Sequence, residues 1–162
     1  MAIALLACAD KAIAAPAQLL NKTVHFSYKF SAPAKGSDGS TITAARQVQR
    51  TIYISSKGRL FTRYERKEGG GTGAKDRGPD KTQFQFSGNQ LVGFLMQASG
   101  ATRVAINFDP EFRTCSLSLL SGAESGKPLQ ARGLNGVVYT ALARPTFSGE
   151  SCSVAEGNAF SS

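Results

Sequence analysis

Single polar residues separate large apolar ones near the start of the chain, and this alternation constrains the fold more than any other feature. The order is Val24, His25, Phe26, Ser27, Tyr28, Lys29, Phe30. Because successive side chains of a β-strand point to opposite faces, the pattern predicts a strand with one buried face. Only residues 15–20 favour a short helical segment, so we expect an all-β protein.

Residues 81–108 contain the clearest series of strands. Turns at Gly88-Asn89 and Ser99-Gly100 predict a three-stranded meander. Two-residue turns would place these residues opposite each other: Phe86 and Leu91, Phe84 and Gly93, Leu95 and Val104, Gly93 and Ile106. The expected apolar face comprises Phe84, Phe86, Leu91, Leu95, Val104, Ile106 and Phe108. The middle strand also has Val92, Phe94 and Met96 on its other face, which we expect to be covered or to border a ligand pocket.

Two strands over residues 43–55 and 59–67 meet at Ser56-Lys57-Gly58 and allow two registers. A three-residue loop with Gly58 in the left-handed conformation places Ile54 opposite Leu60. The apolar face is then Ile52, Ile54, Leu60 and Tyr64, and the other face is Gln49, Thr51, Tyr53, Arg59, Phe61 and Arg63. A two-residue Lys57-Gly58 turn instead sets Ile54 opposite Phe61 and exchanges the faces of the second strand.

Further strands are predicted around residues 115–119, 137–141 and 151–154. The segments 31–42, 68–80 and 121–133 are rich in Gly, Pro, Asp and Ser, and we interpret them as loops. Eight or nine strands joined mainly by turns favour an antiparallel meander, closed or partly open as a barrel, with a two-sheet β-sandwich as the alternative. The barrel is preferred because it requires no long crossover.

Residues 1–17 are rich in Ala and Leu and resemble the end of an export signal. Ala15-Pro16-Ala17 matches the small-residue pattern of a cleavage site, although no Lys or Arg precedes the apolar stretch. A lipoprotein processing box ending at Cys8 and an uncleaved native N-terminus are the alternatives. Residues 18–162 suffice for one all-β domain. No apolar run approaches the roughly 20 residues of a membrane helix.

Removal of this leader would also remove Cys8 and leave two cysteines, Cys115 and Cys152. An even number in an exported chain predicts one disulfide, and therefore a periplasmic or secreted protein. The alternative is a cytosolic protein with two buried thiols.

The formal net charge is +8 at pH 7, which favours an anionic partner such as a glycan or a lipid headgroup, and also suits nucleic acid. Tyr53, Arg59, Phe61 and Arg63 interleave basic and aromatic side chains on one expected strand face. Arginines can hold phosphate or sulfate while rings stack on sugars or bases. Four further cations would enlarge the positive field, namely Arg46, Arg50, Arg66 and Lys67. A solvated sheet face is the simpler interpretation.

Catalytic and metal-binding patterns are weak in this sequence. His25 is the only histidine, and no G-x-S-x-G motif accompanies it. One histidine and two paired cysteines do not supply a zinc site, so we predict no metal and no cofactor. The glycine-rich residues 69–75 lack the Lys-Ser/Thr ending of a phosphate-binding loop. Asp109 and Glu111 are paired carboxylates in sequence, and a turn with solvated acids is the interpretation we favour.

Several short segments carry a resemblance to known proteins: residues 53–59 (YISSKGR), 106–109 (INFD) with 115–117 (CSL), and 149–154 (GESCSV) with 157–158 (GN). Through them the chain resembles a group of short exported alphaproteobacterial proteins of unknown function, and the likeness covers most of residues 19–160. It implies export and a cysteine pair but no activity. We expect a non-enzymatic binding module for an anionic or amphipathic envelope partner; a structural envelope protein and a carboxylate-based hydrolase are the alternatives.

Overall fold

The computed structural model describes residues 14–68, 71–78, 84–97, 100–121, 130–132, 135–142 and 146–160. After a short 3₁₀ helix at Ala17–Leu19, eleven strands lie in these segments. They are β1 (Lys22–Gly36), β2 (Thr41–Ile54), β3 (Leu60–Glu68), β4 (Gly71–Arg77), β5 (Phe84–Ser87), β6 (Gln90–Gln97), β7 (Gly100–Phe108), β8 (Cys115–Ser121), β9 (Gln130–Arg132), β10 (Val138–Ala141) and β11 (Thr146–Glu156). The prediction of an all-β fold is confirmed, with more strands than expected.

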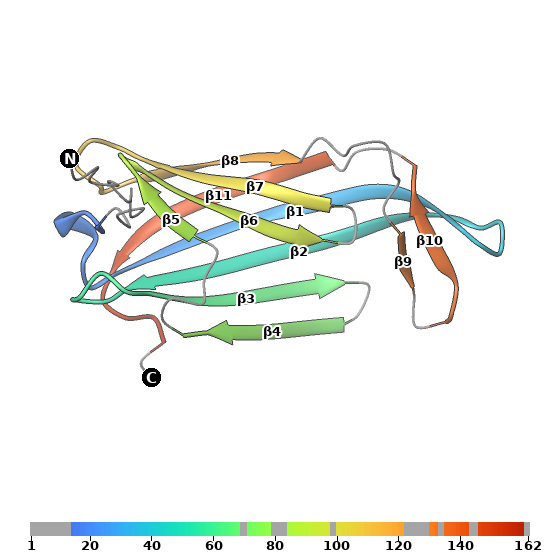
Figure 1. Cartoon of the computed structure of the whole chain (residues 1–162), viewed down its shortest axis with the longest axis horizontal. Coiled ribbons are helices and arrows are strands. Elements are labelled where there is room, and N and C mark those ends of the chain that lie inside the picture. Colours follow the sequence, from blue (N-terminus) through green and yellow to red (C-terminus); the bar gives the residue numbers. More distant parts are fainter. Residues whose placement is uncertain are drawn as a thin grey trace, which may run out of the picture.

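The strands form two antiparallel sheets that pack face to face (Figure 1). Sheet A has the order β4-β3-β2-β1-β10-β9, and β11 also pairs with β1; sheet B has the order β5-β6-β7-β8. The chain leaves sheet A after β4, builds sheet B as a meander, and returns to sheet A. The sheets do not close into a barrel, so the sandwich alternative is the correct one. Closure fails because β10 and β11 pair back onto β1 instead of continuing from β8.

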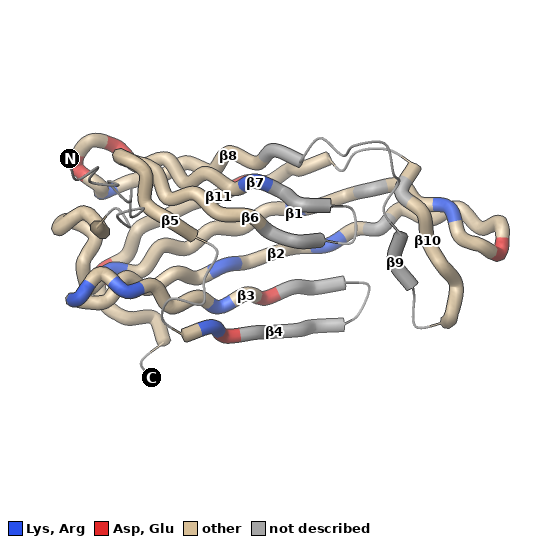
Figure 2. The backbone as a smooth tube through the Cα atoms, viewed as in Figure 1, with Lys and Arg blue, Asp and Glu red and all other residues tan. Residues whose placement is uncertain are grey.

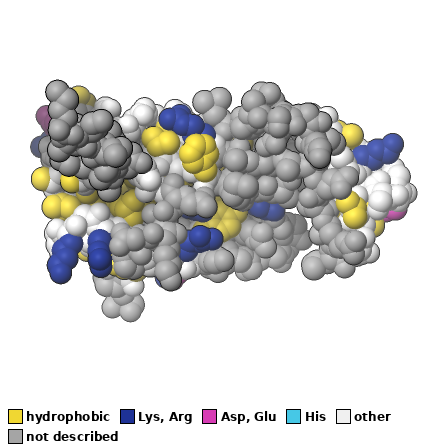
Figure 3. All heavy atoms as spheres, viewed as in Figure 1, with side chains coloured by type: hydrophobic (Ala, Val, Ile, Leu, Met, Phe, Trp, Pro, Cys, Tyr) yellow, Lys and Arg dark blue, Asp and Glu magenta, His cyan; other side chains and the backbone are white. Residues whose placement is uncertain are grey.

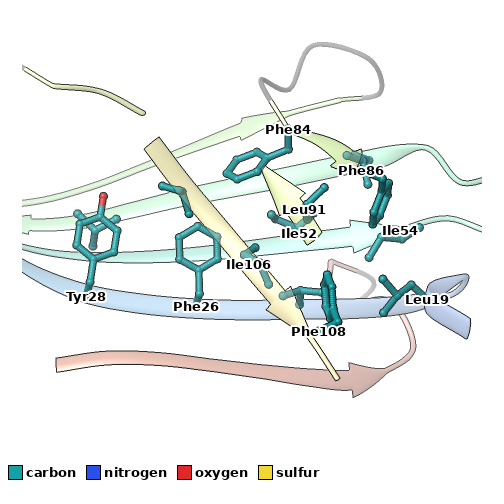
Figure 4. Close-up of a cluster of buried hydrophobic side chains, with 14 of the residues drawn as sticks. Leu19, Phe26, Tyr28, Ile52, Ile54, Phe84, Phe86, Leu91, Ile106 and Phe108 are labelled. Carbon is teal, nitrogen blue, oxygen red and sulfur yellow. The ribbon is translucent and has the colours of Figure 1, made fainter. Parts of the chain in front are cut away.

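The core lies between the two sheets. Fifteen buried apolar residues form one cluster: Leu19, Val24, Phe26, Tyr28, Phe30, Val48, Ile52, Ile54, Leu60, Phe84, Phe86, Leu91, Val104, Ile106 and Phe108. Figure 4 shows aromatic rings from β1 and from sheet B meeting there, with Phe26 edge-on to Phe84 at a ring-centroid distance of 6.2 Å. The predicted apolar alternation of β1 and of the meander is therefore what joins the sheets.

The registers of the meander are partly as expected. Phe86 lies opposite Leu91, as predicted. In the second hairpin Gly93 pairs with Val104 rather than with Ile106, a shift of two residues. A shift of two residues leaves every side chain on its original face, so the predicted apolar face is still correct. The expectation that the other face of β6 is covered is wrong at Phe94, whose side chain is 51% exposed.

The three segments that we interpreted as loops contain strand residues. β1 continues through Pro33, which occupies the gap between the pairings of β1 with β11 and with β10. The Pro33 carbonyl accepts the Leu142 N–H on that side, so the missing amide hydrogen removes no ladder bond. β4 pairs with β3 although residues 71–77 lack large apolar side chains, because an edge strand can be held by backbone hydrogen bonds alone. β9 likewise lies within the expected loop at residues 121–133.

A disulfide joins the sheets at one edge. Cys115 begins β8 of sheet B, and Cys152 lies in β11 of sheet A; the structure bonds them, as predicted. No helix in the described segments has the length and apolar character needed to cross a membrane.

The β2–β3 turn provides a test of the register that the structure selects. Gly58 has φ 75° and the Ser55 N–H donates to the Arg59 carbonyl, so the three-residue alternative is correct and the two-residue turn is wrong. Because a residue with a Cβ resists this left-handed conformation, Gly58→Ala should lower the free energy of unfolding by about 1–2 kcal/mol in urea titrations. Gly78→Ala, at a site with open space, is the matched control. Equal midpoints for the two variants would contradict the assignment.

Candidate functional site

The β2–β3 hairpin places the predicted binding residues on the outer face of sheet A. Its register pairs Tyr53 with Phe61 and Thr51 with Arg63, while Ile52 and Ile54 face the core. We call the face that carries the odd-numbered residues 23–29, 49–53 and 61–65 of β1, β2 and β3, together with Ser151 and Ser153 of β11, the outer face. The predicted grouping of Tyr53, Phe61 and Arg63 therefore exists.

Tyr53 and Phe61 form a pair of half-buried rings on the outer face. Their centroids are 6.1 Å apart with an interplanar angle of 36°. The Tyr53 hydroxyl donates to the Asn21 side-chain oxygen at 3.4 Å, which limits rotation of the ring. Two adjacent rings that keep one side toward solvent offer a stacking surface.

Arg63 is engaged by partners that the sequence did not reveal. It donates two hydrogen bonds to the Asp76 carboxylate of β4, from Nε at 2.7 Å and from Nη2 at 3.0 Å. These bonds raise the pKa of Arg63 and lower the pKa of Asp76. The Arg63 guanidinium also lies 4.9 Å from the Phe160 ring centroid. Its charge is therefore largely balanced. Arg59 is exposed beside the turn, and its backbone N–H donates to Ser55 Oγ at 3.0 Å.

A shallow pocket of about 270 Å³ lies where β1 is flanked by β11 and β2. Phe26, Arg50 and Cys152 line it together with six polar residues of the outer face, namely His25, Ser27, Gln49, Thr51, Ser151 and Ser153. Thr51 Oγ1 lies 3.3 Å from His25 Nδ1, and the hydroxyls of Ser27 and Ser151 are 2.6 Å apart. His25 is thus half-buried and hydrogen-bonded rather than simply solvated. These six side chains can donate and accept hydrogen bonds without carrying a carboxylate.

The pocket arises from register. β1 pairs His25 with Thr51 on one side and with Ser153 on the other, and it pairs Ser27 with Gln49 and Ser151 in the same way. The polar residues therefore form rows across three strands. The alternation of Ser151 and Ser153 with Cys152 and Val154 was visible in the sequence, but the partner strand was not.

The end of the described chain borders the outer face. Thr23 Oγ1 donates to the Gly157 carbonyl at 2.7 Å and accepts the Ala159 N–H at 3.2 Å. The Gly157 N–H also donates to the Asn21 carbonyl. These bonds fix the segment that brings Phe160 against Arg63.

Several other sequence-based candidates lie elsewhere. Arg46 and Arg50 belong to the even-numbered positions of β2, which face sheet B, so they do not enlarge the field around Arg59 and Arg63 as we expected. The side chains of Arg66 and Lys67 lie outside the described residues. Residues 71–75 of the glycine-rich segment belong to β4.

The Asp109 carboxylate stabilises a turn through hydrogen bonds to the backbone. It accepts the backbone N–H groups of Arg113 and Thr114, each at 2.7 Å, and of Glu111 at 3.3 Å. The backbone bond from Thr114 is the largest cause that holds the pKa of Asp109 below its usual value. Glu111 lies 3.3 Å from Arg113 Nε. A carboxyl that ionises so readily is poorly suited to be a general acid.

The fold and the outer face define a class of protein, a disulfide-linked two-sheet β-protein with an aromatic and polar sheet surface. Comparison with known proteins adds no relative: no family model, no curated protein and no solved structure matches the chain.

Proposed function

We propose that this protein is a non-catalytic module that binds an anionic glycan of the cell envelope through the outer face of sheet A. The observation that carries the proposal is that the Tyr53–Phe61 ring pair and the pocket of hydroxyl, amide and imidazole groups lie on the same face, with Thr51 of the pocket two positions before Tyr53 on β2. Sugars present apolar ring faces and many hydroxyl groups, so this combination suits them. A flat sheet face also admits an extended polymer.

Cations at the two ends of the outer face support an acidic glycan. Arg59 lies beside the ring pair, and Lys29 lies beyond Ser27 on β1, where it is exposed. A uronate or sulfate group could interact with either cation while the sugar ring lies on the aromatic surface. Lipid headgroups share the charge but not the need for a row of hydrogen-bonding groups, which favours a glycan.

We also propose that the protein is exported. A disulfide persists in oxidising compartments, and the small-residue pattern at Ala15-Pro16-Ala17 fits a cleaved leader, so we place the protein in the periplasm or outside the cell. Leader residues 1–13 lie outside the described residues. A structural envelope protein would use the same location without glycan affinity, and a hydrolase would show turnover.

Removal of the ring pair should weaken glycan binding. We expect the double variant Tyr53→Ala, Phe61→Ala to lower the affinity for a soluble uronate polymer such as alginate by about tenfold or more, because each stacked ring contributes roughly 1–3 kcal/mol. Isothermal titration calorimetry would measure this change. Arg59→Ala should reduce the salt dependence of the binding and leave part of the affinity.

Phe94→Ala is the matched control, since it removes an exposed ring from the outer side of sheet B. Alginate affinity that is the same in the wild type, the double variant and Phe94→Ala would contradict the proposed site. Binding to anionic vesicles but not to alginate would show that the partner is a lipid.

A further inference from the structure

Arg50 is a cation placed between the two sheets rather than on the surface. It lies on β2 opposite Phe26 of β1 and Tyr64 of β3. Its guanidinium carbon is 5.0 Å from the Tyr64 ring centroid and 5.3 Å from the Phe84 ring centroid. Figure 4 shows Phe84 reaching from sheet B toward β1 and β2. The guanidinium therefore contacts aromatic rings from both sheets.

The charge of Arg50 lacks an acidic counterpart among the described residues. None of the ion pairs found there involves Arg50, and its buried Nε has no hydrogen-bond partner in the same part of the chain. Burial is the main cause that lowers the pKa of Arg50 to about 10, so the group stays protonated at neutral pH. Contacts with ring faces compensate only partly for the lost water. An acceptor in the plane of the guanidinium is what this environment lacks.

A second guanidinium acts on the same region. Arg77 of β4 is exposed and pairs with Thr62 of β3, which lies on the same face of sheet A as Tyr64, the partner of Arg50; the charge of Arg77 is the smallest of the causes that lower the pKa of Arg50. Figure 2 shows Lys or Arg positions on β2, β3 and β4 close to one another, with Asp or Glu positions next to them on β3 and β4. On the face drawn in Figure 3, Lys and Arg side chains are visible at several places. An anion between Arg50 and Arg77 would relieve their repulsion.

We propose that Arg50 and Arg77 form a second binding site, at the β3–β4 side of the sandwich, for a phosphate or sulfate group. Two rings lie 5.0 and 5.3 Å from the Arg50 guanidinium carbon, and Nε has no partner among the described residues, so the guanidinium keeps N–H donors for an anion. Arg77 supplies a second charge. This site is independent of the glycan proposal because it uses Arg50 and Arg77, whereas the outer face uses their neighbours Thr51 and Asp76, which point the other way.

The test measures thermal unfolding of the full chain against inorganic phosphate, with sodium chloride adjusted to constant ionic strength. We expect the midpoint to rise with phosphate, since a ligand that binds only the folded state stabilises it. Arg50→Met, which keeps the length of the side chain without its charge, should lower the phosphate affinity about tenfold or more. Arg77→Gln should lower it about threefold to fivefold, and it tests the site even if Arg50→Met does not fold.

Arg103→Gln is the control, because it removes the same charge from an exposed position on sheet B. Phosphate affinity that falls equally in Arg103→Gln and Arg77→Gln would overturn the proposal. Vesicles of phosphatidylglycerol identify the source of the group: Arg50-dependent binding to these vesicles alone would support the site and assign it to a lipid phosphate. No Arg50-dependent binding to phosphate, sulfate or vesicles would overturn it.

The sequence that leads into β5 contains an acid, so competition from the chain itself needs a test. Asp80 precedes Phe84 by four positions in the sequence and lies outside the described residues. Asp80→Asn should leave the phosphate affinity unchanged or increase it modestly. Binding that appears only in the Asp80→Asn chain would overturn the proposal, because it would show that this carboxylate already fills the site.

Discussion

Replacing Cys115 and Cys152 with alanine should lower the free energy of unfolding by about 4 kcal/mol. The bond closes a loop with a sequence separation of 37, and removing a cross-link of that span restores the corresponding conformational entropy to the unfolded chain. For a domain of this size the loss is a large share of the roughly 5–15 kcal/mol that is typical of folded proteins. Denaturant unfolding followed by circular dichroism would measure it.

The location of the disulfide is a second reason to expect a large loss of stability. β8 is the edge strand of sheet B, and β11 pairs only with β1 among the described strands, so no hydrogen-bonded ladder joins the two sheets at this edge. Only the disulfide and side-chain packing connect them there. Reductant should therefore lower the stability of the wild type to that of the double variant and leave the variant itself unchanged. A wild-type midpoint that does not respond to complete reduction would contradict this role.

The residues of two turns were enough to predict the hairpins that contain them. The Ser56-Lys57-Gly58 and Gly88-Asn89 turns each lie between strands that pair within a few residues, and the structure confirms the registers of both hairpins. The predicted register of the second hairpin was wrong by two residues because Gly100 pairs with Gln97 as the first residue of β7 instead of lying in the turn. Alternation could not correct that error, because both registers bury the same side chains.

Pairing between distant strands was not predictable in the same way. β1 and β11 are separated by more than one hundred residues, and neither strand has a sequence pattern that identifies the other as its pairing partner. Edge strand β4 has no alternation of apolar residues, and its backbone pairing with β3 does not require one. The sequence therefore did not predict this strand. The pairings of β10 and β11 with β1 decide between sandwich and barrel, which explains why the preference for a barrel was wrong while the all-β prediction was right.

The candidate site was likewise predictable only where its residues belong to one hairpin. Tyr53, Phe61 and Arg63 were found because one hairpin places them together. The partners of Arg63, namely Asp76 and Phe160, come from β4 and from the end of the described chain, and the pocket requires β11 beside β1. Arg50 was expected to enlarge the positive field around Arg59 and Arg63, although its position in the alternation already placed it on the face of Ile52 and Ile54.

Phe26→Ala should lower the free energy of unfolding by about 3–5 kcal/mol, the range expected for removal of a fully buried aromatic ring. Phe26 is 2% exposed, and its ring meets Phe84 of the opposite sheet in an edge-on contact. Phe94→Ala, which removes a ring that is 51% exposed, should change the stability by less than about 0.5 kcal/mol in the same urea titration.

The contact between the two rings can be isolated by a double-mutant cycle. Phe84→Ala alone and the double variant with Phe26→Ala complete it, and a coupling energy of about 0.5–1.5 kcal/mol is expected for an aromatic pair. Since His25 and Ser27 flank Phe26 but point to the outer face, alginate binding by the folded fraction should survive all three substitutions. A Phe26→Ala chain as stable as the Phe94→Ala chain would mean that the two sheets do not pack through this ring.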